Sequence, residues 1–465
     1  MNRHKKLGLL IYLSFGCMLC CFGHGDADDS AKRTQLADLR TRKTGSDWQS
    51  FLGPTGDGKS PEKGLYLPWH KSGPPVIWHK PIGTGYAAPS VAKGRLFNFD
   101  RHWNNARLTC MRSETGEELW RFEYPTDYED MYGYNNGPRA CPLVDEDRVY
   151  VFGAEGMLHC VGAVNGELIW KVNTTEEFNV VKNFFGVASA PIVERNLLIV
   201  QIGGSPPGSP EDVYAAQGRL SGNGSGIVAF DKFTGEVRYK ITDELASYAS
   251  PTVATINGRR WGFMFARGGL FGFEPRTGKV DFHYPWRSKK LESVNAANPV
   301  VAGDLVFISE AYGRGSSLLK VRPSGYQVVW KDAYRRRSKS MMLHWNTAIH
   351  HSGYLYGCSG RHTQGSDLRC VKLESGEVMW SERINERTSL LYVDGYFVGL
   401  GEYGTLMLIR ANSKEPEVVS RVQITDERGQ ELIGYPAWAA PVLSNGFLYI
   451  RGKDRLVCLD LGLKK

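Results

Sequence analysis

The chain has 465 residues and a mass of 51.9 kDa, which exceeds an average domain of roughly 100–200 residues and leaves room for several domains or one repetitive domain. Hydrophobic residues make up 42% and charged residues 23%, a balance that excludes a disordered, collagen-like or multispanning membrane protein. The net charge is +8 and the basic residues are scattered, apart from a run at 335–339. No continuous basic stripe therefore indicates a nucleic-acid partner.

The first segment, residues 1–25, has the pattern of a secretory signal peptide. Arg3, Lys5 and Lys6 precede an apolar run over residues 7–22, and small residues follow. We expect export to the periplasm or the extracellular space. A transmembrane anchor is the alternative, but the run is shorter than the roughly 20 apolar residues that a bilayer requires. A lipid anchor on one of the cysteines at 17, 20 and 21 also stays open, although no Leu-small-small sequence precedes them. Peripheral association with a membrane is a further alternative.

Residues 26–47 are polar, with five acidic and five basic side chains, and predict a solvated linker. Between residues 48 and 465 one short sequence motif recurs, which consists of a small residue followed by a proline and then by hydrophobic residues. Its prolines stand at 89, 142, 191, 251, 299 and 441. Degenerate copies at 346–350 and 388–392 fill the long last gap, so a single domain of eight repeats is expected.

Each repeat predicts four short antiparallel strands. Apolar stretches alternate with turns, and the closing phrase, such as SETGEELW, AVNGELIW or LESGEVMW, places a turn glycine before the last strand. A closing Trp stands at 120, 170, 330 and 380, with Tyr239 and Phe282 in other copies. Four strands per 44 to 60 residues is typical of a propeller blade. We therefore predict an all-β, eight-bladed β-propeller of four-stranded antiparallel blades in which tryptophans dock between neighbouring blades.

The last repeat contains only three strands before the chain ends. The segment 74–82, PPVIWHKPI, precedes the first repeat and carries Trp78 in the closing-strand pattern. Pairing this segment as the outer strand of the last blade would close the ring and leave no open sheet edge. We expect this N-terminal strand to complete the propeller.

Six cysteines remain after residue 25, and an even number in an exported protein can indicate disulfides. Four of them, Cys110, Cys160, Cys370 and Cys458, instead recur at one repeat position, where other copies have Ala229 or Gly272. A position that alternates between Cys, Ala and Gly is typical of a small core residue.

The multiplied TGExxW phrase and the opening stretch DWQSFLGPTGDGKSPEKGL resemble the PQQ-like propeller family, which includes pyrroloquinoline quinone (PQQ) dehydrogenases and outer-membrane assembly factor B. The resemblance covers roughly residues 47–465 and implies the eight-bladed ring. For a dehydrogenase, the resemblance implies a quinone that packs against a ring formed by two adjacent cysteines, together with a Ca²⁺ ion that is bound by Glu, Asn and Asp side chains. The only adjacent pair here, Cys20 and Cys21, falls in the signal peptide. We predict no cofactor and no metal, with PQQ and calcium as the alternative.

The predicted blades place their loops on two faces of the ring. The Gly-Glu turns lie on one face, and the longer loops on the other face are rich in aromatic, amide, guanidinium and imidazole groups. Such groups over a rigid ring are typical of a recognition surface, although plugging the channel would also explain them. The candidate binding residues are Arg101, His102, Tyr132, Tyr134, Asn135, Arg139, Asn183, Glu310, Tyr312, Arg314, His344, Trp345, Asn346, Arg361, His362 and Trp438.

From these features we expect an exported, monomeric, noncatalytic binding or scaffold module whose loop face takes a protein, peptide or glycan. No catalytic residue is assigned. The alternative is a PQQ- or metal-dependent oxidoreductase, an alcohol-type dehydrogenase, that uses the same face.

Overall fold

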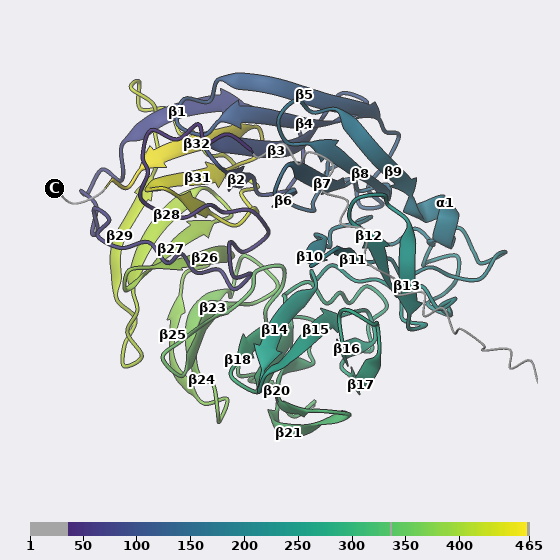
Figure 1. Ribbon diagram of the computed structural model, residues 1–465. Helices are drawn as coiled ribbons and strands as arrows, with labels where there is room; N and C mark the ends of the chain where they lie inside the picture. The colour runs from purple at the N-terminus through teal and green to yellow at the C-terminus, as the bar shows by residue number, and fades with distance from the viewer. Residues whose placement is uncertain (1–35, 335–336, 463–465) are drawn as a thin grey trace, which may run out of the picture. The chain divides into compact units, whose positions relative to one another are not determined.

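The computed structural model describes residues 36–334 and 337–462, and the expected signal peptide, residues 1–25, lies outside the described residues. Within the unit Gln35–Lys465 the chain forms eight four-stranded antiparallel sheets. Figure 1 shows these sheets following one another in chain order around a common centre. The predicted eight-bladed β-propeller is confirmed.

Each of the first seven blades uses four consecutive strands. Blades 1 to 4 contain β2 (Ser90–Ala92), β3 (Arg95–His102), β4 (Asn105–Arg112), β5 (Glu118–Pro125); β6 (Leu143–Asp145), β7 (Arg148–Phe152), β8 (Met157–Gly162), β9 (Leu168–Asn173); β10 (Ile192–Glu194), β11 (Leu197–Gln201), β12 (Ile227–Asp231), β13 (Val237–Ile241); β14 (Thr252–Ile256), β15 (Arg259–Phe265), β16 (Gly269–Phe273) and β17 (Val280–Pro285). Blades 5 to 7 contain β18 (Val300–Ala302), β19 (Leu305–Glu310), β20 (Gly315–Arg322), β21 (Gly325–Lys331); β22 (Ile349–His351), β23 (Tyr354–Ser359), β24 (Asp367–Lys372), β25 (Val378–Arg383); β26 (Thr388–Val393), β27 (Tyr396–Gly401), β28 (Thr405–Arg410) and β29 (Val418–Gln423). A short helix, α1 (Thr174–Phe178), lies between blades 2 and 3.

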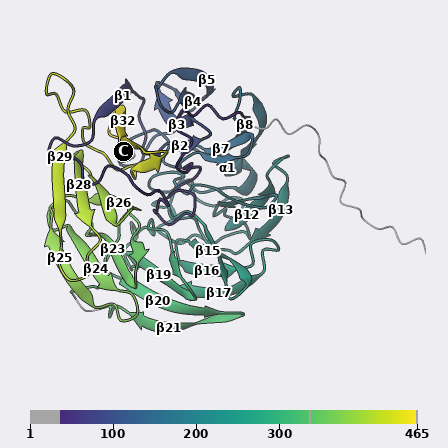
Figure 2. The ribbon, with the colours of Figure 1, turned by 60° about the vertical axis from the view of Figure 1, so that its left-hand side comes forward.

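The eighth blade joins the two ends of the domain. It contains β30 (Val442–Ser444), β31 (Phe447–Arg451) and β32 (Arg455–Asp460), and β1 (Val76–Pro81) pairs with β32 as the outer strand. Figure 2 shows the purple β1 beside the yellow β32. Trp78 of β1 donates its indole N–H to the carbonyl of Ser113 in blade 1, at 3.0 Å. The predicted closure of the ring is confirmed.

Tryptophan docking repeats the same contact around the ring. The indole of Trp120 donates to the carbonyl of Ala163 in the next blade (3.2 Å), and Trp170, Trp330 and Trp380 make the equivalent bond to a carbonyl of the blade that follows. The ring of Trp120 lies over Gly166, the turn glycine of the next blade, whose φ is +73°. A Cβ at Gly166 would lie 2.5 Å from this ring, so glycine is required both by the backbone and by the tryptophan.

The small repeat position lies directly opposite the closing aromatic residue. Cys110 pairs with Trp120 across β4 and β5, and the corresponding pairs join Cys160 to Trp170, Cys370 to Trp380, Cys458 to Trp78, Ala229 to Tyr239 and Gly272 to Phe282. Directly opposed side chains in a sheet are in close contact, so a bulky ring on one strand favours a small residue on its neighbour. The six described cysteines are free and buried, and for four of them, Cys110, Cys160, Cys370 and Cys458, the repeat position predicted this.

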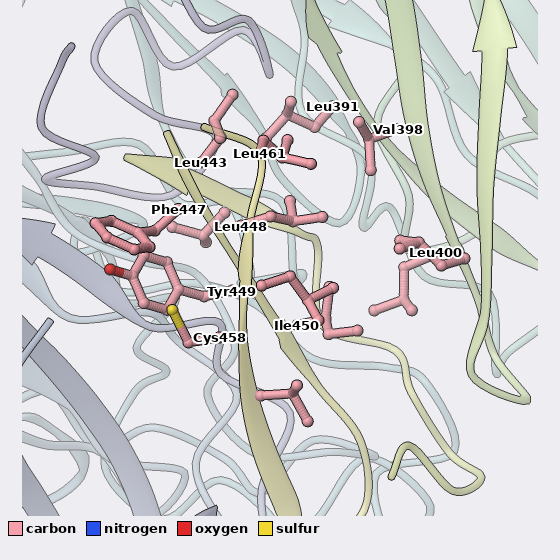
Figure 3. Close-up of a cluster of buried hydrophobic side chains, with 14 of the residues drawn as sticks. Leu391, Val398, Leu400, Leu443, Phe447, Leu448, Tyr449, Ile450, Cys458 and Leu461 are labelled. Atoms are coloured by element: carbon pink, nitrogen blue, oxygen red, sulfur yellow. The ribbon is translucent and has the colours of Figure 1, made fainter. Parts of the chain in front are cut away.

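The core fills the spaces between neighbouring blades. Figure 3 shows one such cluster, in which Leu391, Val398 and Leu400 of blade 7 and Leu448 and Ile450 of blade 8 are buried together. No helix in the ranges 36–334 and 337–462 has the length and apolar character needed to cross a bilayer.

The N-terminal segment packs against the propeller. In the described part of the expected linker, 36–47, Leu36 is buried and Arg42 forms an ion pair with Asp460 (2.7 Å). Farther along, Trp48 exchanges two backbone hydrogen bonds with Val91 of β2, and the carbonyl of residue 49 accepts one from β6. Residues 58–60 bond to β26. The segment thus runs along the inner strands from blade 2 to blade 7, on the face that carries the tight turns.

Candidate functional site

A funnel-shaped cavity of about 400 Å³ lies at the centre of the loop face. Its inner wall is built from the repeated phrase, because the small residue before the proline lines the cavity in five blades. These residues are Ala88, Cys141, Ala190, Ser250 and Ala440. Small side chains at the entry to each innermost strand leave the central space open, whereas larger ones would fill it.

Phe51 lines the funnel from the N-terminal segment. It belongs to the part of that segment that crosses the turn face, and it packs against the cores of blades 8 and 2. A residue that lies outside the repeats therefore contributes to the funnel wall.

The mouth of the funnel is a cluster of tilted and edge-to-face aromatic rings around Trp438. Its ring centroid lies 4.8 Å from that of Tyr86 and 5.0 Å from that of Trp345, and Tyr134 and Tyr435 stand at 6.2 and 6.0 Å. These residues come from loops of blades 1, 2, 6 and 8. Rings at such separations present flat apolar faces together with polar edges.

A buried ion pair fixes one side of this cluster. The carboxylate of Glu402 is fully buried and lies 2.5 Å from the guanidinium of Arg387, which stacks over Trp345 at 4.2 Å from the ring centroid. The same carboxylate accepts the indole N–H of Trp438 (3.1 Å). Burial raises the pKa of Glu402, but hydrogen bonding and the charge of Arg387 outweigh it and hold the pKa below its ordinary value.

Two further arginines line the funnel. Arg139 pairs with the buried carboxylate of Asp130 (2.5 Å) and faces the ring of Tyr86. Arg361 stacks on Tyr312, 4.3 Å from its centroid, and has no carboxylate within ion-pair distance in the described parts of the chain. Since Asp130 and Glu402 neutralise two of the three guanidinium groups, the charge of Arg361 is the one available to an acidic ligand.

His344 lies between Tyr312 and Trp345. Its Nε2 is hydrogen bonded to the Tyr312 hydroxyl (3.1 Å), and its buried Nδ1 has no partner among the described residues. Burial, assisted by Arg387, Arg361 and His362, lowers its pKa to about 3. The imidazole is therefore neutral at pH 7, with a pKa far from the value that suits a general base at that pH.

The funnel brings together half of the residues expected from the sequence. Those that line it are Tyr134, Arg139, Tyr312, His344, Trp345, Arg361, His362 and Trp438. Tyr132 lies beside it, packed at a tilt against Phe185 and hydrogen bonded to Tyr214.

The remaining expected residues lie away from the funnel lining. Arg101 donates to the carbonyls of Trp103, Tyr128 and Asn136 and holds its loop, while His102 is exposed. Glu310 is buried and accepts three backbone N–H groups from its own loop, and Asn346 donates to the carbonyl of Cys358. Arg314 covers Trp286, Asn135 accepts the N–H of Gly137, and Asn183 lines a second cavity.

Several funnel residues were not in the expected set. Tyr86 and Tyr248 each stand three residues before a repeat proline, and Arg387 directly precedes β26. Distance from the repeat proline could have identified the two tyrosines, because the residue just before the proline also lines the cavity in five blades. Phe51 had no such signal in the sequence.

The donor set of the funnel does not suit a calcium-quinone centre. No Asp or Glu is among its lining residues, and the nearby Glu402 is already paired with Arg387. Calcium requires six to eight oxygen ligands, several of them carboxylates. Within the described ranges, no group of three His, Cys, Asp or Glu side chains is placed to hold a metal ion.

The eight sheets, the docked tryptophans and the axial funnel define a β-propeller protein of the PQQ-like repeat class. A family model described as outer membrane protein assembly factor BamB matches residues 104–382, more than half of the chain, and the chain belongs to this family. No curated protein matches the sequence.

Two solved structures show the same fold at low sequence identity. BamB from Moraxella catarrhalis is 11% identical with a TM-score of 0.54, over 83% of this chain and 97% of that one. Quinohemoprotein alcohol dehydrogenase from Comamonas testosteroni is 13% identical with a TM-score of 0.61, over 90% of this chain and 81% of that one. The fold is thus shared by an assembly factor and by an oxidoreductase.

Proposed function

We propose that the chain is an exported, monomeric, noncatalytic binding module that takes an exposed part of a protein, peptide or glycan into the funnel. One observation carries the proposal: the funnel is lined by closely packed aromatic rings and three guanidinium groups, and by no carboxylate. Pockets that join apolar walls to a few placed polar groups are typical of ligand sites. The N-terminal sequence pattern supports export, and the family description supports a protein ligand.

Arg361 is the proposed anchor for an acidic group of the ligand. Its guanidinium has no acidic partner in the described parts of the chain, and it lies on the ring of Tyr312 beside the neutral His344. A ligand carboxylate can accept two parallel N–H bonds from a guanidinium group, which gives both affinity and orientation. Trp345 and Trp438 then offer flat surfaces for an aromatic side chain or a sugar ring.

A fluorescence titration tests this proposal, because two tryptophans line the funnel. The probes are a peptide rich in Glu and Tyr, a matched peptide rich in Lys and Tyr, and a uronic-acid oligosaccharide. We expect saturable quenching with an acidic probe and not with the basic peptide. Arg361→Ala should weaken binding about tenfold or more, equivalent to about 1.4 kcal/mol.

The control is Arg322→Ala, at an exposed position on the turn face, which should bind as the unmodified protein does. Equal binding of the acidic and basic peptides, or binding unaffected by Arg361→Ala, would contradict the proposal.

The second candidate, a PQQ-dependent oxidoreductase, is favoured by the guanidinium groups, which suit an anionic quinone. A separate assay addresses it: purified protein is incubated with PQQ, Ca²⁺ and ethanol, and alcohol oxidation is followed. Saturable turnover at one quinone per chain would replace the binding proposal with the enzymatic one.

A further inference from the structure

A second cavity, of about 410 Å³, lies on the loop face among blades 2, 3 and 4. Its walls come from the links that enter these blades, and part of its cover is the long insertion between β11 and β12. The insertion is fixed by backbone hydrogen bonds, including Val213 to the carbonyl of Lys182 (3.1 Å). Asn223 ties its far end to the carbonyls of Phe178 and Ser205.

Three of the residues that line this cavity each hold a buried polar atom with no hydrogen-bond partner among the described residues. These groups are the hydroxyl of Tyr128, the hydroxyl of Ser189 and Nε of Arg267, whose residues are 7%, 1% and 4% exposed. The three residues belong to three different loops, which join β5 to β6, β9 to β10 and β15 to β16. A buried polar group without a partner destabilises the folded chain, so three such groups around one cavity indicate that a polar ligand completes their hydrogen bonds.

Arg267 is the most informative of the three. It is a buried cation with no carboxylate within ion-pair distance in the described parts of the chain, and its one hydrogen bond runs from Nη2 to the carbonyl of Leu291 at 3.4 Å. The equally buried Arg451 differs, because it donates to the carbonyls of Ala87 (2.7 Å), Phe99 (3.0 Å) and Gly83 (3.3 Å). The Nε of Arg451 is also without a partner, so the difference lies in the terminal nitrogens: those of Arg451 make three bonds to carbonyls, whereas those of Arg267 make one long bond.

The acidic residues near the cavity do not satisfy Arg267. Glu155 lines the cavity, but its carboxylate accepts hydrogen bonds from Tyr124 (2.7 Å) and Thr126 (3.2 Å). Asp127, Glu129 and Glu211 are exposed residues, and their charges are screened by water. Glu244 is the carboxylate whose charge acts on Arg267, but it makes no ion pair with it among the described residues and lies 3.9 Å from His283. Burial, together with the neighbouring Arg287, outweighs this attraction and lowers the pKa of Arg267 to about 10, which still leaves it charged at pH 7.

We propose that this cavity is a binding site for a small organic anion, whose carboxylate or phosphate group is held by Arg267 with hydrogen bonds from Ser189 and Tyr128. The site is separate from the funnel, because Tyr128, Ser189 and Arg267 do not line the funnel. A volume of this size accommodates a metabolite-sized molecule rather than a single inorganic ion.

Calorimetric titration at constant ionic strength tests the site, with inorganic phosphate and succinate as probes. We expect at least one probe to bind saturably. Arg267→Met should weaken that binding about 10- to 100-fold, the range expected for hydrogen bonds to a charged group. Ser189→Ala, which removes only an unpartnered hydroxyl, should weaken it about fivefold. Arg322→Met is the surface control and should leave the binding unchanged.

Unfolding in urea separates this site from a purely structural role for Arg267. An unpaired buried cation destabilises the ligand-free protein, so Arg267→Met should unfold at the same or a higher urea concentration. Binding of phosphate alone assigns a phosphorylated ligand, and binding of succinate alone assigns a carboxylate ligand. The proposal is overturned if neither probe binds, if binding survives in Arg267→Met, or if this variant unfolds at lower urea.

Discussion

At the scale of single residues, Glu402 organises the mouth of the funnel. Its buried carboxylate holds the guanidinium of Arg387 and the indole of Trp438, and Arg387 in turn stacks on Trp345. The positions of two tryptophans and one cation therefore depend on one negative charge.

We predict that Glu402→Gln lowers the free energy of unfolding by about 3 kcal/mol, because it leaves Arg387 as a buried cation without its counterion. Since the pKa of Glu402 in the folded chain lies below its ordinary value of 4.5, the contribution of the pair is complete above that pH and is lost as the pH falls toward the folded pKa. The difference between the two proteins in urea unfolding should therefore shrink below about pH 4.5.

A matched control is Glu417→Gln, which breaks the exposed Arg410–Glu417 pair. Exposed pairs contribute about 0–1 kcal/mol, so this variant should stay close to the unmodified protein at every pH. An equal loss in both variants would show that burial of Glu402 has no special role.

The sequence identified aromatic and basic residues of the loop face, but it could not separate those that reach the centre from those that hold loops. Arg361 and Arg101 have the same side chain, yet Arg361 lines the funnel, whereas Arg101 donates its hydrogen bonds to backbone carbonyls. That distinction depends on radial position in the ring, which is a long-range property that no local pattern records.

At the scale of elements, the turn before the last strand of a blade is also the surface on which the tryptophan of the neighbouring blade packs. The turn glycines have left-handed backbone conformations, and the tryptophan ring of the preceding blade packs directly against their Cα atoms. The repeated closing phrase thus encodes both a turn and an interface. This is why the strands and the docking could be predicted from the sequence: both depend on residues close together in one short phrase.

We predict that Gly166→Ala is more destabilising than Gly395→Ala. Both glycines have positive φ, +73° and +85°, so each alanine costs roughly 1–2 kcal/mol of backbone strain. Only at position 166 would the new Cβ meet a tryptophan, Trp120, whereas at 395 it meets open space. Thermal and urea unfolding should show an additional loss of about 1–3 kcal/mol for Gly166→Ala. Similar losses would contradict the dual role of the turn.

At the scale of the whole domain, the ring depends on a strand borrowed from its N-terminal part. The sequence predicted this closure because the last repeat lacked a strand and 74–82 carried a spare one. The path of residues 36–60 across the turn face was not predicted, since its backbone hydrogen bonds and ion pairs join residues that are far apart in the sequence and follow no repeated phrase.

We predict that Trp78→Ala lowers the free energy of unfolding by about 3–5 kcal/mol, the usual cost of removing a buried tryptophan. Trp78 is 8% exposed and joins blade 8 to blade 1. Trp103→Ala, which removes a tryptophan that is 85% exposed, serves as the control and should change stability little. Limited proteolysis should cut Trp78→Ala first around residues 74–82, and cleavage elsewhere would argue against this strand as the closing element.

The position of Phe51 has a consequence for how the N-terminal segment takes part in binding. Its side chain lines the funnel and packs against the cores of blades 8 and 2, so a ligand that fills the funnel lies against a residue of the segment that crosses the opposite face of the ring. Occupancy of the funnel and the anchoring of this segment are thereby physically coupled.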